Sequence, residues 1–74
     1  MRINQIFLRP VEGLALSLRT FRGLQNADIK YLGELVQCTE QELLEINNFG
    51  RKSLNEIKAI LADLRLSLGM RLDD

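Results

Sequence analysis

The chain has 74 residues, 46% of them hydrophobic and 5% aromatic, with one cysteine and no histidine, which predicts one small domain with a leucine-rich core. Its ten basic and ten acidic residues give no net charge, which by itself argues against a nucleic-acid partner. No apolar run approaches the roughly 20 residues of a membrane span, the N-terminus does not resemble a signal peptide, and a lone cysteine cannot form an internal disulfide, so we expect a soluble intracellular domain that binds no membrane.

Residues 1–15 predict an irregular N-terminal arm whose apolar side chains pack onto the domain. Leucines alternate over residues 14–18, as in a strand. Helical spacing of apolar residues begins at Leu18. We favour a first helix over about 17–26, with Ser17 as its N-cap, because no other segment offers a partner strand.

Two short helices are expected next. Asp28 can cap the first of them, whose apolar face consists of Ile29, Leu32, Leu35 and Val36. Thr39 and Glu42 have the spacing of a capping box, in which each side chain accepts a hydrogen bond from the other residue's backbone N–H. This box predicts a third helix that buries Leu43, Leu44 and Ile46.

A turn and the longest helix complete the sequence. Residues 47–50, Asn-Asn-Phe-Gly, predict a turn, because asparagine tolerates left-handed backbone and glycine has no Cβ to obstruct it. A helix over about 51–64 follows, with an apolar stripe of Leu54, Ile57, Ile60, Leu61 and Leu64. Residues 66–72 are too apolar to be left in water and predict a tail that folds back.

These elements together predict an all-α fold, a compact bundle of four short helices around one leucine and isoleucine core. The arm over 1–15 would pack on a helical domain over 16–74. A glycine hairpin, similar to a helix-hairpin-helix motif, would precede the last helix.

The sequence offers little for catalysis. Cys38 has no histidine or second cysteine as a partner, and a structural zinc ion needs about four Cys, His or carboxylate ligands. No glycine-rich loop of the kind that binds nucleotide phosphates occurs. The acids at 40, 42 and 45 are better explained as capping and solvated side chains. We therefore expect a non-catalytic domain with no cofactor and no metal.

Charge is unevenly distributed along the sequence. Residues 1–27 hold four arginines and one glutamate, and residues 28–46 hold five acids and one lysine. Residues 47–74 hold five bases and four acids. Because binding depends on local potential rather than on total charge, the domain can still present a basic face to a nucleic acid.

The start of the last predicted helix has the features of an anion site. Free backbone N–H groups at a helix N-terminus carry about half a unit of positive charge. Gly50, Arg51, Lys52 and Ser53 place two cations and a hydroxyl donor there. Cations are unfavourable at this end of a helix, so their presence indicates an anionic partner such as DNA phosphate. The alternative is a simple turn glycine beside solvated bases.

A second basic cluster, Arg19, Thr20, Arg22 and Gly23, lies at the start of the first predicted helix. Arg19 and Arg22 are three residues apart and project from one face. A solvated helix face would explain this pair alone, but two basic helix starts in one small domain indicate a shared DNA surface. Arginine can also enter a narrow minor groove, where the potential over A·T-rich DNA is most negative.

Several separate blocks of the sequence follow the pattern of one family in the same order. They are Phe7-Leu8-Arg9-Pro10-Val11, Leu18-Arg19-Thr20, Tyr31-Leu32-Gly33-Glu34-Leu35-Val36-Gln37, Thr39-Glu40, Glu42-Leu43-Leu44, Asn48-Phe49-Gly50-Arg51-Lys52-Ser53-Leu54, Glu56-Ile57-Lys58 and Leu66-Ser67-Leu68-Gly69-Met70-Arg71-Leu72. From about Phe7 to Leu72, the sequence resembles the C-terminal domain of the bacterial RNA polymerase alpha subunit.

The resemblance implies a helical domain that a flexible linker joins to the rest of RNA polymerase, with a cytoplasmic, nucleoid-associated location. It implies binding to the minor groove of A·T-rich upstream promoter DNA, and docking of transcription activators and the sigma factor. Arg19 would enter the groove, and Glu56 would orient that arginine. Contacts to sugar and phosphate would come from Asn48, Gly50, Lys52 and Ser53. Activators would meet Thr39, Glu40 and Arg71.

The sequence departs from the family pattern at two places. Arg22-Gly23 replaces the usual Asn-Cys pair, so a longer cation replaces an amide at this part of the DNA surface, which predicts stronger non-specific phosphate contact. The stretch that faces sigma in the family is usually acidic, whereas residues 11–15 retain only Glu12. A second hypothesis is therefore a helical protein-docking module with weakened or lost DNA binding. No sustained heptad pattern predicts a dimer, so we expect a monomer.

Overall fold

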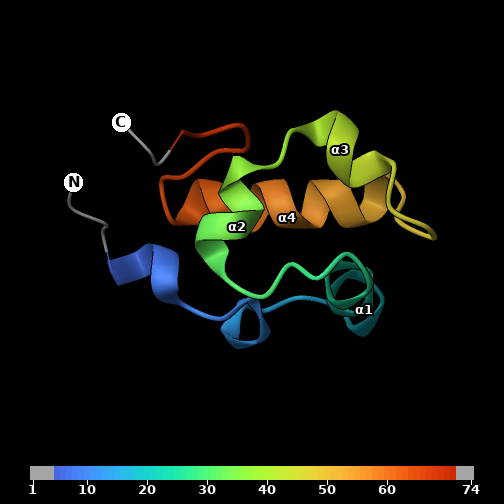
Figure 1. Ribbon diagram of the computed structural model, residues 1–74, viewed down its shortest axis with the longest axis horizontal. Coiled ribbons are helices and arrows are strands. Elements are labelled where there is room, and N and C mark those ends of the chain that lie inside the picture. The colour runs from blue at the N-terminus through green and yellow to red at the C-terminus, as the bar shows by residue number, and fades with distance from the viewer. Residues whose placement is uncertain (1–4, 72–74) are drawn as a thin grey trace.

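The computed structural model describes residues 5–71 and is built from short helices (Figure 1). In sequence order the elements are two 3₁₀ helices, η1 (Gln5–Leu8) and η2 (Val11–Gly13), then α1 (Leu18–Asn26), α2 (Leu32–Gln37), α3 (Glu40–Leu44) and α4 (Arg51–Asp63). Within the described range there is no β-strand, only an isolated antiparallel bridge between Pro10 and Tyr31. The predicted all-α fold with four short α-helices is confirmed.

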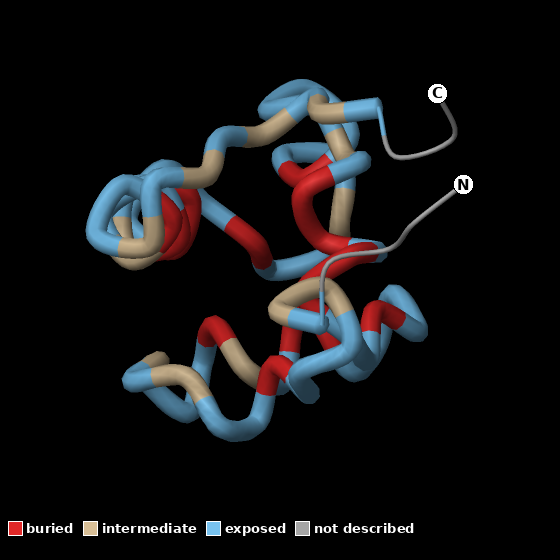
Figure 2. Tube along the Cα trace, turned by 90° about the vertical axis from the view of Figure 1, so that its left-hand side faces the viewer, coloured by how far each residue is buried: buried red, intermediate tan, exposed pale blue. Residues whose placement is uncertain are grey.

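Helix α4 runs through the middle of the molecule, with α1 on one side of it and α3 on the other (Figure 1). Most of the predicted apolar stripe of α4 faces inward: Leu54, Ile57 and Leu61 are each 1% exposed, whereas Ile60 and Leu64 are half-buried. The other buried hydrophobic residues are Val11, Leu24, Ile29, Leu32, Leu35, Val36, Leu43 and Phe49. Figure 2 shows that these buried segments turn toward one interior.

The N-terminal arm is more regular than the irregular segment expected, because it forms η1 and η2. Its packing is extensive. Val11 is 2% exposed, and its N–H donates to the Lys30 carbonyl oxygen at 2.9 Å. The Leu32 N–H donates to the Arg9 carbonyl oxygen at 2.8 Å. These bonds anchor the arm beside the start of α2.

Helix α3 begins with the predicted capping box. The Glu42 N–H donates to Thr39 Oγ1 at 3.1 Å, and the Thr39 N–H donates to Glu42 Oε1 at 2.9 Å. Leu43 is fully buried, but Leu44 is 37% exposed, contrary to the prediction that α3 buries both. Adjacent residues of a helix point in different directions, so a helix of five residues turns only one of the pair inward.

Helix α1 extends as predicted and is capped by Ser17, whose Oγ accepts from the Thr20 N–H at 3.3 Å. It ends in a Schellman motif, in which Asp28 adopts a left-handed φ of 59° and the Ile29 N–H donates to the Leu24 carbonyl oxygen at 2.9 Å. Asp28 therefore ends α1, and the prediction that it caps the next helix is wrong. Helix α2 follows Tyr31 as its N-cap.

The same type of ending closes α4. Arg65 has a left-handed φ of 61°, its N–H donates to the Ala62 carbonyl oxygen at 3.0 Å, and the Leu66 N–H donates to the Leu61 carbonyl oxygen at 2.7 Å. A non-glycine residue in this position is strained.

The C-terminal tail folds back, as predicted, over the part of it that the structure describes. The Gly69 N–H donates to the Cys38 carbonyl oxygen and the Met70 N–H donates to the Val36 carbonyl oxygen, each at 2.8 Å. Leu66, Leu68 and Met70 are half-buried against the core. Leu72 lies outside the described residues.

Candidate nucleic-acid interface

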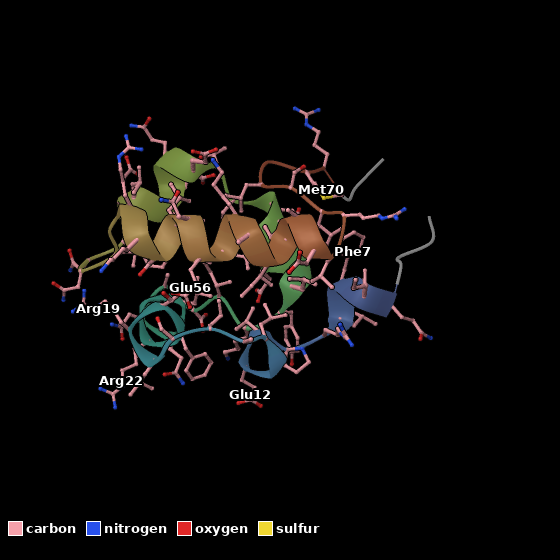
Figure 3. The ribbon with its side chains drawn as sticks, turned by 180° about the vertical axis from the view of Figure 1, so that it is seen from behind. Phe7, Glu12, Arg19, Arg22, Glu56 and Met70 are labelled. Carbon is pink, nitrogen blue, oxygen red and sulfur yellow. The ribbon has the colours of Figure 1, made fainter. Side chains whose placement is uncertain are left out.

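The arginines of α1 stand at the end of the molecule where α4 begins. Arg19 and Arg22 are exposed and project outward, and the first turns of α4 lie at the same end (Figure 3). Their three-residue spacing places both on one helical face. Because α1 packs against α4, the two basic clusters seen in the sequence meet in one region of the surface.

Glu56 of α4 holds the first turn of α1. The Ser17 N–H donates to Glu56 Oε1, and the Ser17 hydroxyl donates to Glu56 Oε2 at 3.0 Å. Thr20 Oγ1, which is buried, is within hydrogen-bond distance of both Glu56 Oε2 (3.0 Å) and Ser53 Oγ (2.9 Å). A polar network of four side chains therefore joins the beginning of α1 to the first half of α4.

This network keeps Glu56 ionised. The Ser17 N–H is the main reason that the pKa of Glu56 lies below its usual value; burial opposes the shift, and the hydroxyls of Ser17 and Thr20 reinforce it. A carboxylate at the N-terminus of a helix is stabilised by the helix dipole. The Glu56 carboxylate thus already occupies the N-terminus of α1. An anionic partner would therefore contact α1 through its arginine side chains.

The start of α4 differs, because no side chain caps it. Gly50 is the N-cap, without a side-chain hydrogen bond. Its φ of −110° and ψ of −174° are ordinary extended values, and no atom lies within 4 Å of a Cβ built there. The left-handed residue of the preceding turn is Asn48, with φ of 63°. The backbone conformation at position 50 therefore does not require the glycine of the predicted hairpin. The N–H groups of the first turn of α4 have no side-chain cap, which leaves this helix start open to an anion.

Two hollows in the surface lie around Arg19. One, of about 310 Å³, is lined by Arg19, Arg22, Gly23, Asn26, Asn47 and Asn48. The other, of about 480 Å³, is lined by Ser17, Arg19, Lys52, Ser53 and Glu56. Arg19 lines both hollows. Every residue that the sequence predicted to bind DNA, except Gly50, lines one of the two.

Several residues of this surface differ from the sequence-based expectation. Ser53 is only 3% exposed and faces Thr20 rather than solvent. Sequence reasoning missed Asn26 and Asn47. Asn26 had a signal, since it lies four residues after Arg22 and therefore on the same face of α1. Asn47 is brought in by the turn before α4, which sequence spacing does not specify.

The arginines of this surface have no acidic partner. Among residues 5–71 the ion pairs are Lys30–Asp28, at 3.6 Å, and Lys58–Glu40, at 3.2 Å. Neither Arg19 nor Arg22 takes part in one, and the Glu56 carboxylate receives its hydrogen bonds from hydroxyl and backbone groups. The surface therefore keeps its positive charge available to an anion.

Comparison with known proteins identifies the family of this domain. The model of one family, the C-terminal domain of the bacterial RNA polymerase alpha chain, matches residues 2–63. The protein belongs to this family. It is 57% identical over 72 residues to DNA-directed RNA polymerase subunit alpha of Geobacter metallireducens, covering 97% of this sequence and 21% of that protein. The corresponding protein of Desulfotalea psychrophila is 57% identical over 70 residues, covering 95% and 20%.

The fold is also similar to a solved structure. The NMR structure of the C-terminal domain of the RNA polymerase alpha subunit from Helicobacter pylori has a TM-score of 0.77 and 39% sequence identity, covering 99% of this sequence and 65% of that one. The present domain spans about a fifth of the length of the curated alpha subunits it matches.

The residues of this alpha C-terminal domain that are expected to meet protein partners line neither of the two hollows around Arg19. Glu12 is exposed on η2 (Figure 3). Thr39 uses its hydroxyl to cap α3, and Glu40 pairs with Lys58 of α4. Arg71 is exposed at the end of the tail. Thr39 and Glu40 are adjacent in the sequence, whereas Glu12 belongs to the N-terminal arm on another part of the molecule.

Over residues 5–71 no group of three or more His, Cys, Asp or Glu side chains could hold a metal ion. Burial, followed by the charges of Glu42 and Glu34, raises the pKa of the Cys38 thiol, which disfavours the nucleophilic thiolate. No helix in this part of the protein is long and apolar enough to cross a membrane.

Proposed function

We propose that this alpha C-terminal domain binds double-stranded DNA, with Arg19 in the minor groove of A·T-rich upstream promoter sequence. The observation that carries the proposal is that Arg19 lines both hollows, so the arginines of α1 and the open start of α4 form one basic surface. A narrow minor groove over A·T-rich DNA has the most negative potential and accepts an inserted arginine.

Each part of the surface has a distinct role in this proposal. Asn48 and Lys52, with the free N–H groups of α4, contact sugar and phosphate on one side of the groove. Arg22 contacts phosphate from α1 on the other side. Glu56 orients Arg19 by fixing the turn of α1 from which it projects, through Ser17.

Fluorescence anisotropy with short A·T-rich and G·C-rich duplexes tests this function. The wild-type domain should bind the A·T-rich duplex more tightly, with an affinity that falls as salt rises by a log–log slope of about −0.9 per neutralised phosphate. Arg19→Ala should remove the A·T preference. Arg65→Gly is the matched control, because it removes the same charge at the opposite end of α4. Equal affinity of Arg19→Ala and wild type for the A·T-rich duplex would refute the proposal.

A second candidate function, protein docking, is favoured by an apolar surface beside the basic one. Two hollows, of about 320 and 250 Å³, share Glu12 and Phe21 in their linings. Leu18 and Tyr31 at these hollows are 62% and 49% exposed. A partner with apolar side chains and a base facing Glu12 would fit. In the family pattern residues 11–15, which include Glu12 of both hollows, face sigma, while Thr39, Glu40 and Arg71 face activators.

Titration of the isotope-labelled domain with purified sigma factor separates these surfaces. Docking at the apolar surface should shift NMR signals of Leu18 and Phe21, with Thr39 unmoved. No shift at Leu18, under conditions where DNA binds, would exclude sigma from this surface.

We further propose that the domain is non-catalytic, joins the rest of RNA polymerase, and works in the cytoplasm at the nucleoid.

A further inference from the structure

Gly23 of α1 faces the ring of Phe49, which lies in the turn before α4. A Cβ built on Gly23 would lie 2.6 Å from Phe49 Cδ1 and 3.2 Å from Cε1. Carbon atoms are in optimal contact at about 3.5–4.0 Å. The aromatic ring therefore occupies the space that any side chain at position 23 would need.

The ring cannot readily move aside. Phe49 is 5% exposed and belongs to the hydrophobic core cluster, where side chains are close-packed. Gly23 is itself buried within α1 and does not have a positive φ. A glycine inside a helix costs about 1 kcal/mol relative to alanine. The space taken by the ring, rather than backbone conformation, explains why glycine is needed at this position.

The contact lies between the residues proposed to hold DNA. Gly23 follows Arg22 and lies one helical turn after Arg19, while Phe49 follows Asn48 and is three residues before Lys52. Gly23 also lines the hollow between the α1 arginines and Asn48. The distance between α1 and the turn before α4 therefore sets the width of this hollow.

We propose that Gly23 and Phe49 are a pair of positioning residues that sets the separation between the α1 arginines and the Asn48–Lys52 segment, and thereby the affinity for DNA. The inference rests on the proposed DNA-binding function. A Cβ at position 23 forces α1 and the turn apart, so the two sets of contacts no longer match the same groove. Replacing the ring with a smaller side chain removes that conflict.

A double-mutant cycle measures this coupling. Wild type, Gly23→Ala, Phe49→Leu and the double variant are titrated with the A·T-rich duplex by anisotropy. Gly23→Ala should raise Kd about tenfold, and the double variant should return to within about threefold of wild type; this rescue, of about threefold or more, corresponds to about 0.7 kcal/mol or more. Gly13→Ala is the matched control, because no atom lies within 4 Å of a Cβ there, and it should bind as wild type does.

Thermal melts of the same proteins separate positioning from stability. A purely structural role would lower the melting temperature and leave the Kd of the folded protein unchanged, which would overturn the inference. If Gly23→Ala does not fold, the comparison is between Phe49→Leu and the double variant. Phe49→Leu alone leaves a gap beside Gly23 and no longer holds the separation, so it should bind more weakly than wild type. The added methyl group of the double variant fills that gap, so the double variant should bind more tightly than Phe49→Leu, and equal or weaker binding would overturn the inference. Wild type that fails to bind DNA would overturn the proposed function and this inference together, whereas normal binding by Gly23→Ala would overturn only the inference.

Discussion

Replacing Glu56 with glutamine tests whether this carboxylate stabilises the junction of α1 and α4. The substitution keeps the shape of the side chain but removes its charge, and one of its two acceptor oxygens becomes a donor facing the groups of Ser17 and Thr20. A charge at a helix terminus contributes about 0.3–1 kcal/mol, and a typical intramolecular hydrogen bond contributes about 0.5–1.5 kcal/mol. We expect a loss of about 1 kcal/mol at neutral pH, which lowers Tm by about 4–8 °C in a domain of this size.

The effect should depend on pH with a defined sign. Because the pKa of Glu56 is lowered in the folded state, chiefly by the Ser17 N–H, its contribution is complete above the ordinary glutamate pKa of about 4.3. That contribution is lost as the pH falls through the lowered pKa. Wild type and Glu56→Gln should therefore differ in urea or thermal denaturation at neutral pH and converge in acid.

The matched control is Glu45→Gln. Glu45 is exposed, and its side chain makes no hydrogen bond or ion pair with the rest of the described residues. It should denature as wild type does at every pH. Equal stability of Glu56→Gln and wild type at neutral pH, or a difference that persists unchanged in acid, would refute the role assigned to the Ser17–Glu56 contact.

Two further substitutions test the helix ends. Arg65→Gly should raise the free energy of unfolding by about 1 kcal/mol, because Arg65 holds a left-handed φ of 61° at the end of α4; an unchanged or lower Tm would contradict this. Thr39→Ala should lower stability by about 1 kcal/mol in urea denaturation through loss of the capping bond to the Glu42 N–H, whereas Thr39→Ser, which keeps the hydroxyl, should cost much less. Equal losses in these two variants would show that the hydroxyl is not the stabilising group.

The sequence by itself determined the elements whose signals are local. The helical spacing after Leu18 and the apolar stripe over 51–64 specified α1 and α4, because each can bury only one face. The Thr39–Glu42 capping box specified the start of α3, since both of its hydrogen bonds lie within four residues. The two basic clusters were also visible, because arginine and lysine close to a helix start are a feature of sequence alone.

Only the tertiary structure decided how these clusters are joined. Glu56 contacts Ser17 across 39 positions of the sequence, and no local pattern specifies such a pair. The role of Gly23 was equally hidden, because in the sequence it is only a glycine in a helix, whereas in the fold the ring of Phe49 occupies the place of its side chain. The left-handed conformation of Asp28 likewise follows from the way α1 ends. Local patterns fix helices, but the packing of α1 against α4 decides which of their side chains meet.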